Sequence, residues 1–254
     1  MIITNLKKVR YGYQVTIGDQ THLLEEDTIV KCMLSKGKEV TTKQLNDILK
    51  ENQKAFYTRK GLLYLKNAHS IHEFKVYLRN LGADDTNVDT ITNEFKKRHY
   101  LDDTYYAKIM VDRNKQKYGK SKIEHLLISK GIHKDIIETL KMDLDIESLK
   151  DKIQKAVSLN KKPNYYQAKN TLLRQFVSKG YELDVVSKLL DEQLKSHTFN
   201  PSSMLKKEIT KLLKKYAALD DYNQIQKIKQ ALYQKGYSHQ AIIDTLTEMG
   251  NNDV

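Results

Sequence analysis

Three pairs of adjacent aspartates carry the side chains best suited to acid–base or metal chemistry: Asp84-Asp85, Asp102-Asp103 and Asp220-Asp221. Paired carboxylates can bind a metal ion or divide the roles of general acid and general base. Neighbouring residues on a helix, however, diverge by about 100°. Each pair also stands at a predicted helix junction, where aspartate is favoured as an N-cap. We therefore interpret the pairs as helix caps, and an enzyme with an Asp-Asp metal site is the weakest of three functional hypotheses.

Histidine and cysteine offer no better catalytic centre. His69 and His72 could share one face of a helix, but no third ligand is near them in sequence, so we interpret them as solvated or hydrogen-bonded side chains. The single Cys32 cannot form an internal disulfide and is expected to be a small buried apolar residue in a reducing compartment. The chain also lacks phosphate-loop, H-E-x-x-H and G-x-S-x-G motifs. We predict a protein that is not an enzyme and uses no metal or cofactor.

Basic residues alternate with aromatic rings in the segments 98–100, 113–120 and 161–166. In such segments cations can contact phosphates while rings stack on bases. Alternatively, the tyrosines pack between helices and the lysines only solvate the surface. The residues alone leave both interpretations open. The net charge of +12 indicates an anionic partner, which could be nucleic acid, an acidic protein surface or anionic lipid.

The first thirty residues predict a small antiparallel sheet. Arg10–Ile17 is rich in β-forming residues, and Gly18-Asp19 separates it from Thr21–Leu24, which is the pattern of a hairpin. Ile2–Leu6 is a candidate third strand. From Thr28 onward the apolar spacing becomes helical, with Gly37 as an expected C-cap and Thr41 or Thr42 as the next N-cap.

Four glycines reveal an internal repeat. Gly82, Gly131, Gly180 and Gly236 lie 49, 49 and 56 residues apart, and each follows an apolar helical segment and precedes a shorter one. A further helical segment lies upstream of each glycine helix, so the repeating unit is predicted to have three helices. The predicted fold class is mainly α, with tandem three-helix repeats in an elongated curved array and a small N-terminal antiparallel β segment.

The predicted boundaries follow from this repeat: 1–50 for the β-hairpin segment with short helices, then 51–100, 101–147, 148–198 and 199–254 for repeats one to four. Gly131 and Gly180 are expected to have positive φ at helix ends. The residues predicted to lie in the core are Leu78, Leu127, Phe176, Leu232, Ile137, Val186 and Ile243.

The second repeat resembles the central segment of the RecX family, the bacterial regulatory proteins of the RecA recombinase. The resemblance rests on Tyr100-Leu101-Asp102-Asp103-Thr104-Tyr105-Tyr106-Ala107, then Arg113, Gly119-Lys120 and Leu127-Ile128-Ser129-Lys130-Gly131-Ile132. In the first repeat, Leu62–Leu65 and Ser70–Phe74 are also similar to family motifs, whereas Ala68-His69 stands where the family commonly has arginines. The third and fourth repeats keep the apolar and glycine pattern without the Asp-Asp motif. The resemblance is specific over about residues 60–140 and looser over about 55–250.

The resemblance implies a non-catalytic regulator that binds RecA and its filaments on single-stranded DNA and modulates recombinase activity. Inhibition is the expected direction, and stimulation in the cell stays open as the alternative. A nucleic-acid-binding module acting independently of RecA is the alternative. We expect a cytoplasmic protein that does not contact membranes, because the first residues lack a signal-peptide pattern and no apolar run is long enough to cross a bilayer. We also expect a monomer. Direct contact with single-stranded DNA stays an open question at this point. The predicted contact residues are Arg79, Arg98, Arg113, Lys117, Lys120, Lys122, Lys130, Arg174 and Lys179.

Overall fold

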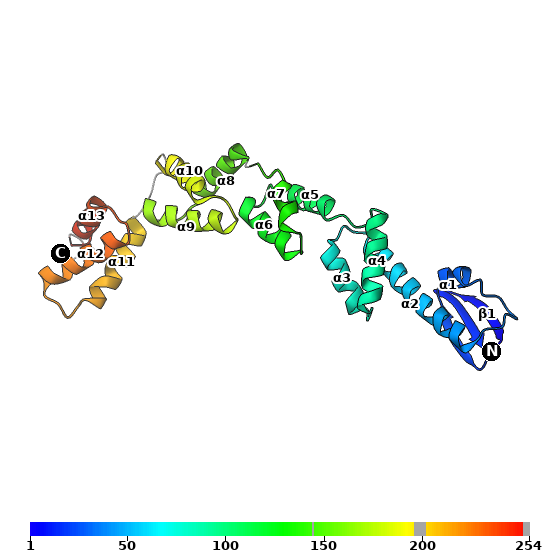
Figure 1. Cartoon of the computed structure of the whole chain (residues 1–254). Helices are drawn as coiled ribbons and strands as arrows, with labels where there is room; N and C mark the ends of the chain where they lie inside the picture. Colours follow the sequence, from blue (N-terminus) through cyan, green and yellow to red (C-terminus); the bar gives the residue numbers. More distant parts are fainter. Residues whose placement is uncertain (144, 196–201, 251–254) are drawn as a thin grey trace. The chain divides into compact units, whose positions relative to one another are not determined.

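The computed structural model describes residues 1–143, 145–195 and 202–250, and within these ranges it contains thirteen helices and one three-stranded sheet (Figure 1). The chain forms two compact units. One comprises Met1–Met110 and Leu126–Leu140, and the other comprises Val111–His125 and Lys141–Val254. The predicted fold class, mainly α with a small N-terminal antiparallel sheet, is confirmed.

The sheet has the strand order β1-β2-β3, with β1 at Ile3–Val9, β2 at Gly12–Ile17 and β3 at Gln20–Leu24. Both pairings are antiparallel, and Val15 faces Leu6 on one side and His22 on the other. Gly18 has a φ of 58°, which confirms the predicted hairpin turn. One face of the sheet packs on Leu34, Val40, Leu45 and Ile48 and forms the first hydrophobic core, against which Cys32 is half-buried.

The helix after the sheet ends earlier than predicted. Helix α1 covers Glu26–Lys31 and has Cys32 as its C-cap, so the assignment of Gly37 as the C-cap is wrong. Gly37 lies instead in a loop that borders β1: its N–H donates to the carbonyl of Ile3 (2.8 Å), and the N–H of Ile3 donates to the carbonyl of Lys38 (3.0 Å). The loop pairs with the strand and thereby satisfies backbone groups that a longer helix would have left unbonded.

Helix α2 covers Thr42–Tyr64 and runs through position 50, where the first predicted boundary falls. Thr41 is its N-cap and forms a reciprocal capping box with Gln44. Of the two predicted N-caps, Thr41 and Thr42, the first is therefore confirmed. The N-terminal half of α2 contributes Leu45 and Ile48 to the core of the sheet. Its C-terminal end contributes Tyr64 to a second core with Phe74 and Phe95. One continuous helix is therefore shared by two cores.

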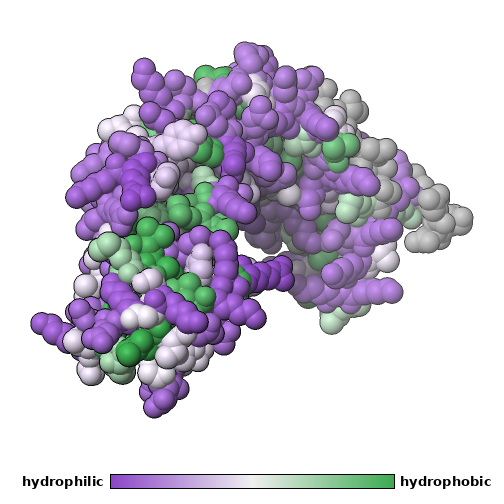
Figure 2. Space-filling model, turned by 90° about the vertical axis from the view of Figure 1, so that its right-hand side faces the viewer, coloured by the Kyte–Doolittle hydropathy of each residue, from purple (hydrophilic) through white to green (hydrophobic). Residues whose placement is uncertain are grey.

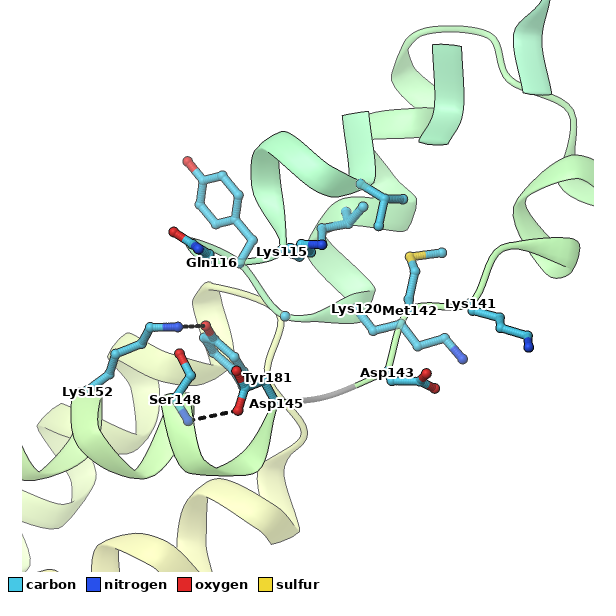
Figure 3. A pocket seen from close by; sticks show the side chains of 14 residues that line it. Lys115, Gln116, Lys120, Lys141, Met142, Asp143, Asp145, Ser148, Lys152 and Tyr181 are labelled. Atoms are coloured by element: carbon cyan, nitrogen blue, oxygen red, sulfur yellow. Dashed lines mark hydrogen bonds between the residues drawn. The ribbon is translucent and has the colours of Figure 1, made fainter. Parts of the chain in front are cut away.

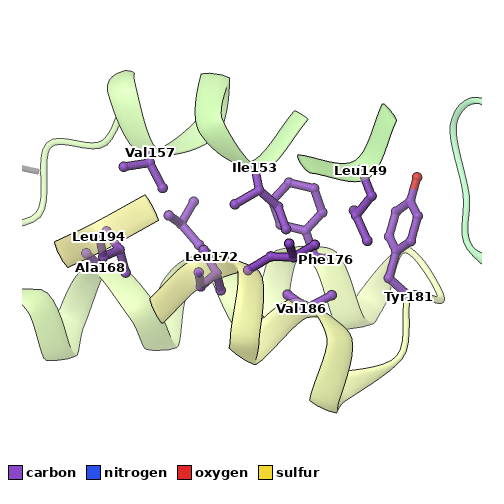
Figure 4. Packing of buried hydrophobic residues seen from close by; sticks show 11 residues of the cluster. Leu149, Ile153, Val157, Ala168, Leu172, Phe176, Tyr181, Val186 and Leu194 are labelled. Atoms are coloured by element: carbon purple, nitrogen blue, oxygen red, sulfur yellow. The ribbon is translucent and has the colours of Figure 1, made fainter. Parts of the chain in front are cut away.

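The second core lies among α2, α3 (Ile71–Asn80) and α4 (Asp85–Lys97). It is followed by α5 (Asp103–Asn114), α6 (Lys120–Ser129) and α7 (Lys134–Thr139). The next three helices are α8 (Ile146–Ser158), α9 (Tyr165–Ser178) and α10 (Leu183–Lys195), which enclose a core that includes Ile153, Phe176 and Leu190 (Figure 4). The last three are α11 (Ser202–Lys215), α12 (Asp221–Gln234) and α13 (His239–Gly250). We propose these four groups of three helices as the four repeats.

The predicted core is confirmed at Leu78, Leu127, Phe176, Leu232, Ile137 and Val186, all of which are buried. Ile243 is only half-buried, and its neighbour Ile242 occupies the core instead. Adjacent helical residues point about 100° apart, so only one of the two isoleucines can face the interior of the group. The face that contains Ile242 also contains Leu246 and Met249, at helical spacing.

The four glycines of the repeat all have positive φ, between 76° and 90°, which confirms the prediction for Gly131 and Gly180. Three of them also lie against an earlier helix. A Cβ built on Gly131 would be 2.4 Å from Cβ of His72, one on Gly180 would be 2.3 Å from the backbone nitrogen of Lys122, and one on Gly236 would be 2.6 Å from Cβ of Tyr166. No side chain fits at these three contacts, so glycine is required by space as well as by φ.

The lysine before each of these three glycines anchors the contact through its backbone carbonyl. The carbonyl of Lys130 accepts from Oγ of Ser70 (2.6 Å), that of Lys179 from the N–H of Gly119 (2.8 Å), and that of Lys235 from Nδ2 of Asn164 (3.2 Å). Ser70, Gly119 and Asn164 each stand immediately before a second helix of the preceding group, at α3, α6 and α9. A hydrogen bond to the carbonyl of the lysine before the glycine thus recurs at three places in the chain, although its donor differs each time.

Candidate partner-binding surface

The aspartate pairs lie at helix N-termini, as predicted. Asp84 and Asp220 are the N-caps of α4 and α12, and Asp102 accepts from the backbone N–H groups of Thr104 (2.8 Å) and Tyr105 (3.0 Å) at the start of α5. Asp103 accepts from the N–H of Ile71 (2.9 Å) and so helps to cap α3. Among the described residues, no three His, Cys, Asp or Glu side chains are placed together as metal ligands.

Asp103 and Glu73 are carboxyls at the junction between α3 and the turn at Lys130. Burial raises the pKa of Asp103, and the hydrogen bond from Ile71 only partly offsets this effect. Burial would also raise the pKa of Glu73, but the hydrogen bonds from Lys130, from the backbone of Ser70 and from Tyr106 outweigh it and lower that pKa. Nζ of Lys130 is 2.6 Å from Oε1 of Glu73. Lys130 therefore holds this junction together, a role that competes with contact to a partner.

Several of the other predicted contact residues are tied to acidic neighbours. Arg79 pairs with Asp85 (3.0 Å) and Arg98 with Glu94 (2.7 Å), while Lys120 is 4.0 Å from Glu124. Lys179 is half-buried, with Nζ 5.3 Å from the centroid of the Phe176 ring. Of the nine predicted contact residues, four are exposed and form no ion pair with the described residues: Arg113, Lys117, Lys122 and Arg174.

Two of the nine predicted residues, Lys117 and Lys179, lie at one groove. We call it the lysine groove. Its volume is about 500 Å³, and it is lined by α8, α9, the turn before α6 and the start of the α9–α10 connection. Lys152, Lys155 and Lys161 also line it, and its described lining contains no acidic residue. The other seven predicted residues do not line this groove.

The polar groups of the lysine groove are held in different ways. Nζ of Lys152 donates to Oη of Tyr181 (3.4 Å), as Figure 3 shows, whereas Lys155 and Lys161 are exposed. Asn160 accepts from the N–H of Lys162 through Oδ1 (3.2 Å). Its Nδ2 is buried and has no acceptor among the described residues. The groove therefore presents five cations and no acid, which is a donor set for oxygen anions.

A smaller pocket of about 170 Å³ shares Lys152 and Tyr181 with the lysine groove (Figure 3). It is lined by cations, among them Lys120, and also by Asp143 and Asp145. Its lining has four lysines and two aspartates, so it should attract an anion less strongly than the lysine groove, which has five lysines and no acid.

Sequence reasoning did not single out Lys152 and Lys155, although the segment 161–166 was noted. A spacing of three residues places them on adjacent parts of one helical face. That spacing was the available signal, but it does not reveal that Lys117 and Lys179 lie beside them. Among the tyrosines of those segments, Tyr100 and Tyr166 are exposed and Tyr118 is half-buried, and stacking of the exposed rings on bases stays a prediction.

Hydrophilic residues cover most of the face shown in Figure 2, with smaller apolar areas between them. No described helix has the length and apolar composition that a membrane crossing needs.

The comparisons with known proteins agree on one family. The model of the third three-helix domain of RecX matches residues 203–246, which lie within the group α11–α13. The regulatory protein RecX of Streptococcus mutans is 29% identical over 98% of this chain and 99% of its own length. A crystal structure of regulatory protein RecX aligns with a TM-score of 0.48 and 19% identity, covering 96% of this chain and 98% of that one. The regulatory protein RecX of Streptococcus uberis is 30% identical over 96% of both chains. With this identity over nearly its whole length, the chain belongs to the RecX family of regulatory proteins.

Proposed function

We propose that this chain regulates the RecA recombinase by binding RecA and its filaments on single-stranded DNA, and that it inhibits recombinase activity without catalysing a reaction. The observation that carries the proposal is the near full-length similarity to regulatory RecX proteins. The net charge of +12 supports it, because a filament that carries DNA phosphates attracts a basic protein. Binding free energy alone can shift a filament equilibrium, so no cofactor is needed.

The four unpaired cations support a binding role more directly than the other predicted residues. Arg113, Lys117, Lys122 and Arg174 do not have to break an ion pair before they meet a partner. Arg79 and Arg98 would exchange one carboxylate for another, and such an exchange yields little free energy at an exposed site. We therefore propose the four unpaired cations as the principal contacts of the nine.

The proposal is tested by adding the purified chain to RecA assembled on single-stranded DNA and following ATP hydrolysis and filament length. We expect both to fall when the chain is present at or below the RecA concentration. Bovine serum albumin at the same concentration controls for crowding. If both quantities stay unchanged, the proposed function is wrong.

A second candidate is a nucleic-acid-binding module that acts without RecA, and the lysine groove is the observation that favours it. Salt-dependent DNA binding without any effect on RecA would support this candidate. We place it second because the relatives are named as regulatory proteins.

A further inference from the structure

The lysine groove has a counterpart in the last group of helices. A groove of about 570 Å³ is lined there by Lys211, Leu212 and Lys215 on α11 and by Ala231 and Lys235 at α12. These positions are 56 residues beyond Lys155, Ala156, Leu159, Gln175 and Lys179, and 56 is also the spacing between Gly180 and Gly236. Two groups of helices thus present a groove at the same place, and lysine occupies two of the matching positions in both.

The two grooves differ in charge at one matching position. Lys152 in the first corresponds to Glu208 in the second, and Glu208 forms an ion pair with Lys235. The described lining of the first groove has five lysines and no acid, whereas that of the second has three lysines and one glutamate. The first groove should therefore attract an anion more strongly than the second.

The rings that belong to the first groove are not free to stack on a base. Phe176 and Tyr181 are only 2% and 5% exposed, and both point into the apolar core of α8–α10 (Figure 4). Lysine binds phosphate as a point charge, without the planar recognition that arginine gives. These groups suit a chain of phosphates and supply no contact that would distinguish one base from another.

We propose that both grooves bind the sugar–phosphate backbone of a nucleic-acid strand, independently of base sequence, and that the groove of α8–α10 is the stronger site. A repeated anion explains why the same cations recur at matching positions in two groups of helices. This proposal rests on the proposed function, because it takes the strand to be the DNA inside the RecA filament.

Direct binding without RecA tests this proposal. The full chain is titrated against a labelled oligo(dT) and against an abasic strand of equal charge, at several salt concentrations. We expect the two strands to bind with similar affinity. The double variant Lys155→Gln with Lys161→Gln should reduce the slope of log affinity against log salt by about 1.4 and lower the affinity roughly 25-fold near 0.1 M salt, the sum of two phosphate contacts to a single strand.

The matched control is Lys188→Gln with Lys195→Gln. It removes the same charge from exposed positions on α10 that do not line the groove. We expect at most a small loss of affinity from this control. An equal loss of affinity in both double variants would show that only net charge matters, and it would overturn the groove assignment. The assignment would also be wrong if the groove variant binds the strand as tightly as the natural chain does.

Replacement of Glu208 provides a test that misfolding cannot mimic, because the expected effect is a gain. Glu208→Gln removes the acid from the second groove and releases Lys235, so affinity for the abasic strand should rise about fivefold near 0.1 M salt. Glu192→Gln makes the same change in charge on the exposed face of α10 and should leave affinity almost unchanged. No gain from Glu208→Gln over this control contradicts the proposal.

Two further results would overturn the inference while leaving the proposed function intact. One is that polyglutamate displaces the strand when both are present at the same concentration of charges, and that polyglutamate binds the groove variant more weakly than the natural chain. This result would assign the groove to an acidic protein segment. The other is that oligo(dT) binds far more tightly than the abasic strand, which would mean that bases are read. Inhibition of RecA by the natural chain is measured separately, so failure of the proposed function is recognised independently.

Discussion

The hydroxyl of Ser70 donates a hydrogen bond to the backbone carbonyl of Lys130 (2.6 Å), although the two residues are sixty positions apart in the chain. Ser70 is fully buried and also caps α3 by accepting from the N–H of Glu73 (3.0 Å). One side chain therefore starts a helix and fastens the turn of the next group against it. Corresponding hydrogen bonds from Gly119 and Asn164 join the later glycine turns to the preceding group of helices.

Ser70→Ala should lower the free energy of unfolding by about 2 to 3 kcal/mol, because it removes a cap and takes the hydroxyl donor away from the partly buried carbonyl of Lys130. Urea unfolding followed by circular dichroism measures the loss. Asp84→Ala, which removes a cap at an exposed site without a long-range bond, should cost only about 1 kcal/mol. Equal losses in the two variants would contradict the fastening role of Ser70.

Glu73 should make stability depend on acid pH. Its pKa is lower in the folded protein than the ordinary value of 4.5, so its stabilising contribution is complete above that value and is lost as the pH falls through the folded-state pKa. Glu73→Gln should therefore be less stable than the natural chain at neutral pH, and the difference should shrink on acidification. A pH-independent difference would disprove this assignment.

Asp103 should act with the opposite sign. Burial raises its pKa above the ordinary value of 3.8, so its contribution is fully present at pH values below 3.8 and is lost as the pH rises through the folded-state pKa. Asp103→Asn keeps an oxygen acceptor for the N–H of Ile71 but cannot ionise. We expect this variant to gain stability relative to the natural chain as the pH rises, and urea unfolding at pH values from about 3 to about 7, a range around the ordinary carboxyl pKa values, measures the gain.

Gly180 and Gly37 form a matched pair for separating backbone strain from crowding, because both have a φ of 87°. A Cβ at Gly37 meets nothing within 4 Å, whereas at Gly180 it would be 2.3 Å from the backbone nitrogen of Lys122. Gly37→Ala should cost about 1 kcal/mol. Gly180→Ala should cost about 3 kcal/mol or more, since the turn must move away from α6. Thermal and urea unfolding of both variants check the difference.

Arg113 and Arg174 should matter more for RecA inhibition than Arg79 and Arg98. The first two are exposed without an ion pair among the described residues, and the latter two are paired with Asp85 and Glu94. Arg113→Gln with Arg174→Gln should raise several-fold the concentration that halves RecA ATP hydrolysis. Arg79→Gln with Arg98→Gln is the control of equal charge. A larger effect in the control would reverse the assignment.

Local patterns in the sequence determined much of this protein. Helical spacing of apolar residues predicts the helices and most of the core, and the glycines mark the turns at Gly131 and Gly180, because these features depend on neighbours within a few residues. The Asp84 and Asp220 caps follow from the same local chemistry. Where two neighbouring residues are equally apolar, as with Ile242 and Ile243, the local pattern cannot decide which one faces the core.

Only the tertiary structure decided which cations are available and which are gathered together. Lys117, Lys155 and Lys179 come from different segments and meet at one groove, whereas Lys130 turns inward to Glu73. The bond between Ser70 and Lys130 is equally invisible to a local pattern. Contacts of this kind depend on how whole helices pack, because packing brings together residues that no short-range periodicity connects.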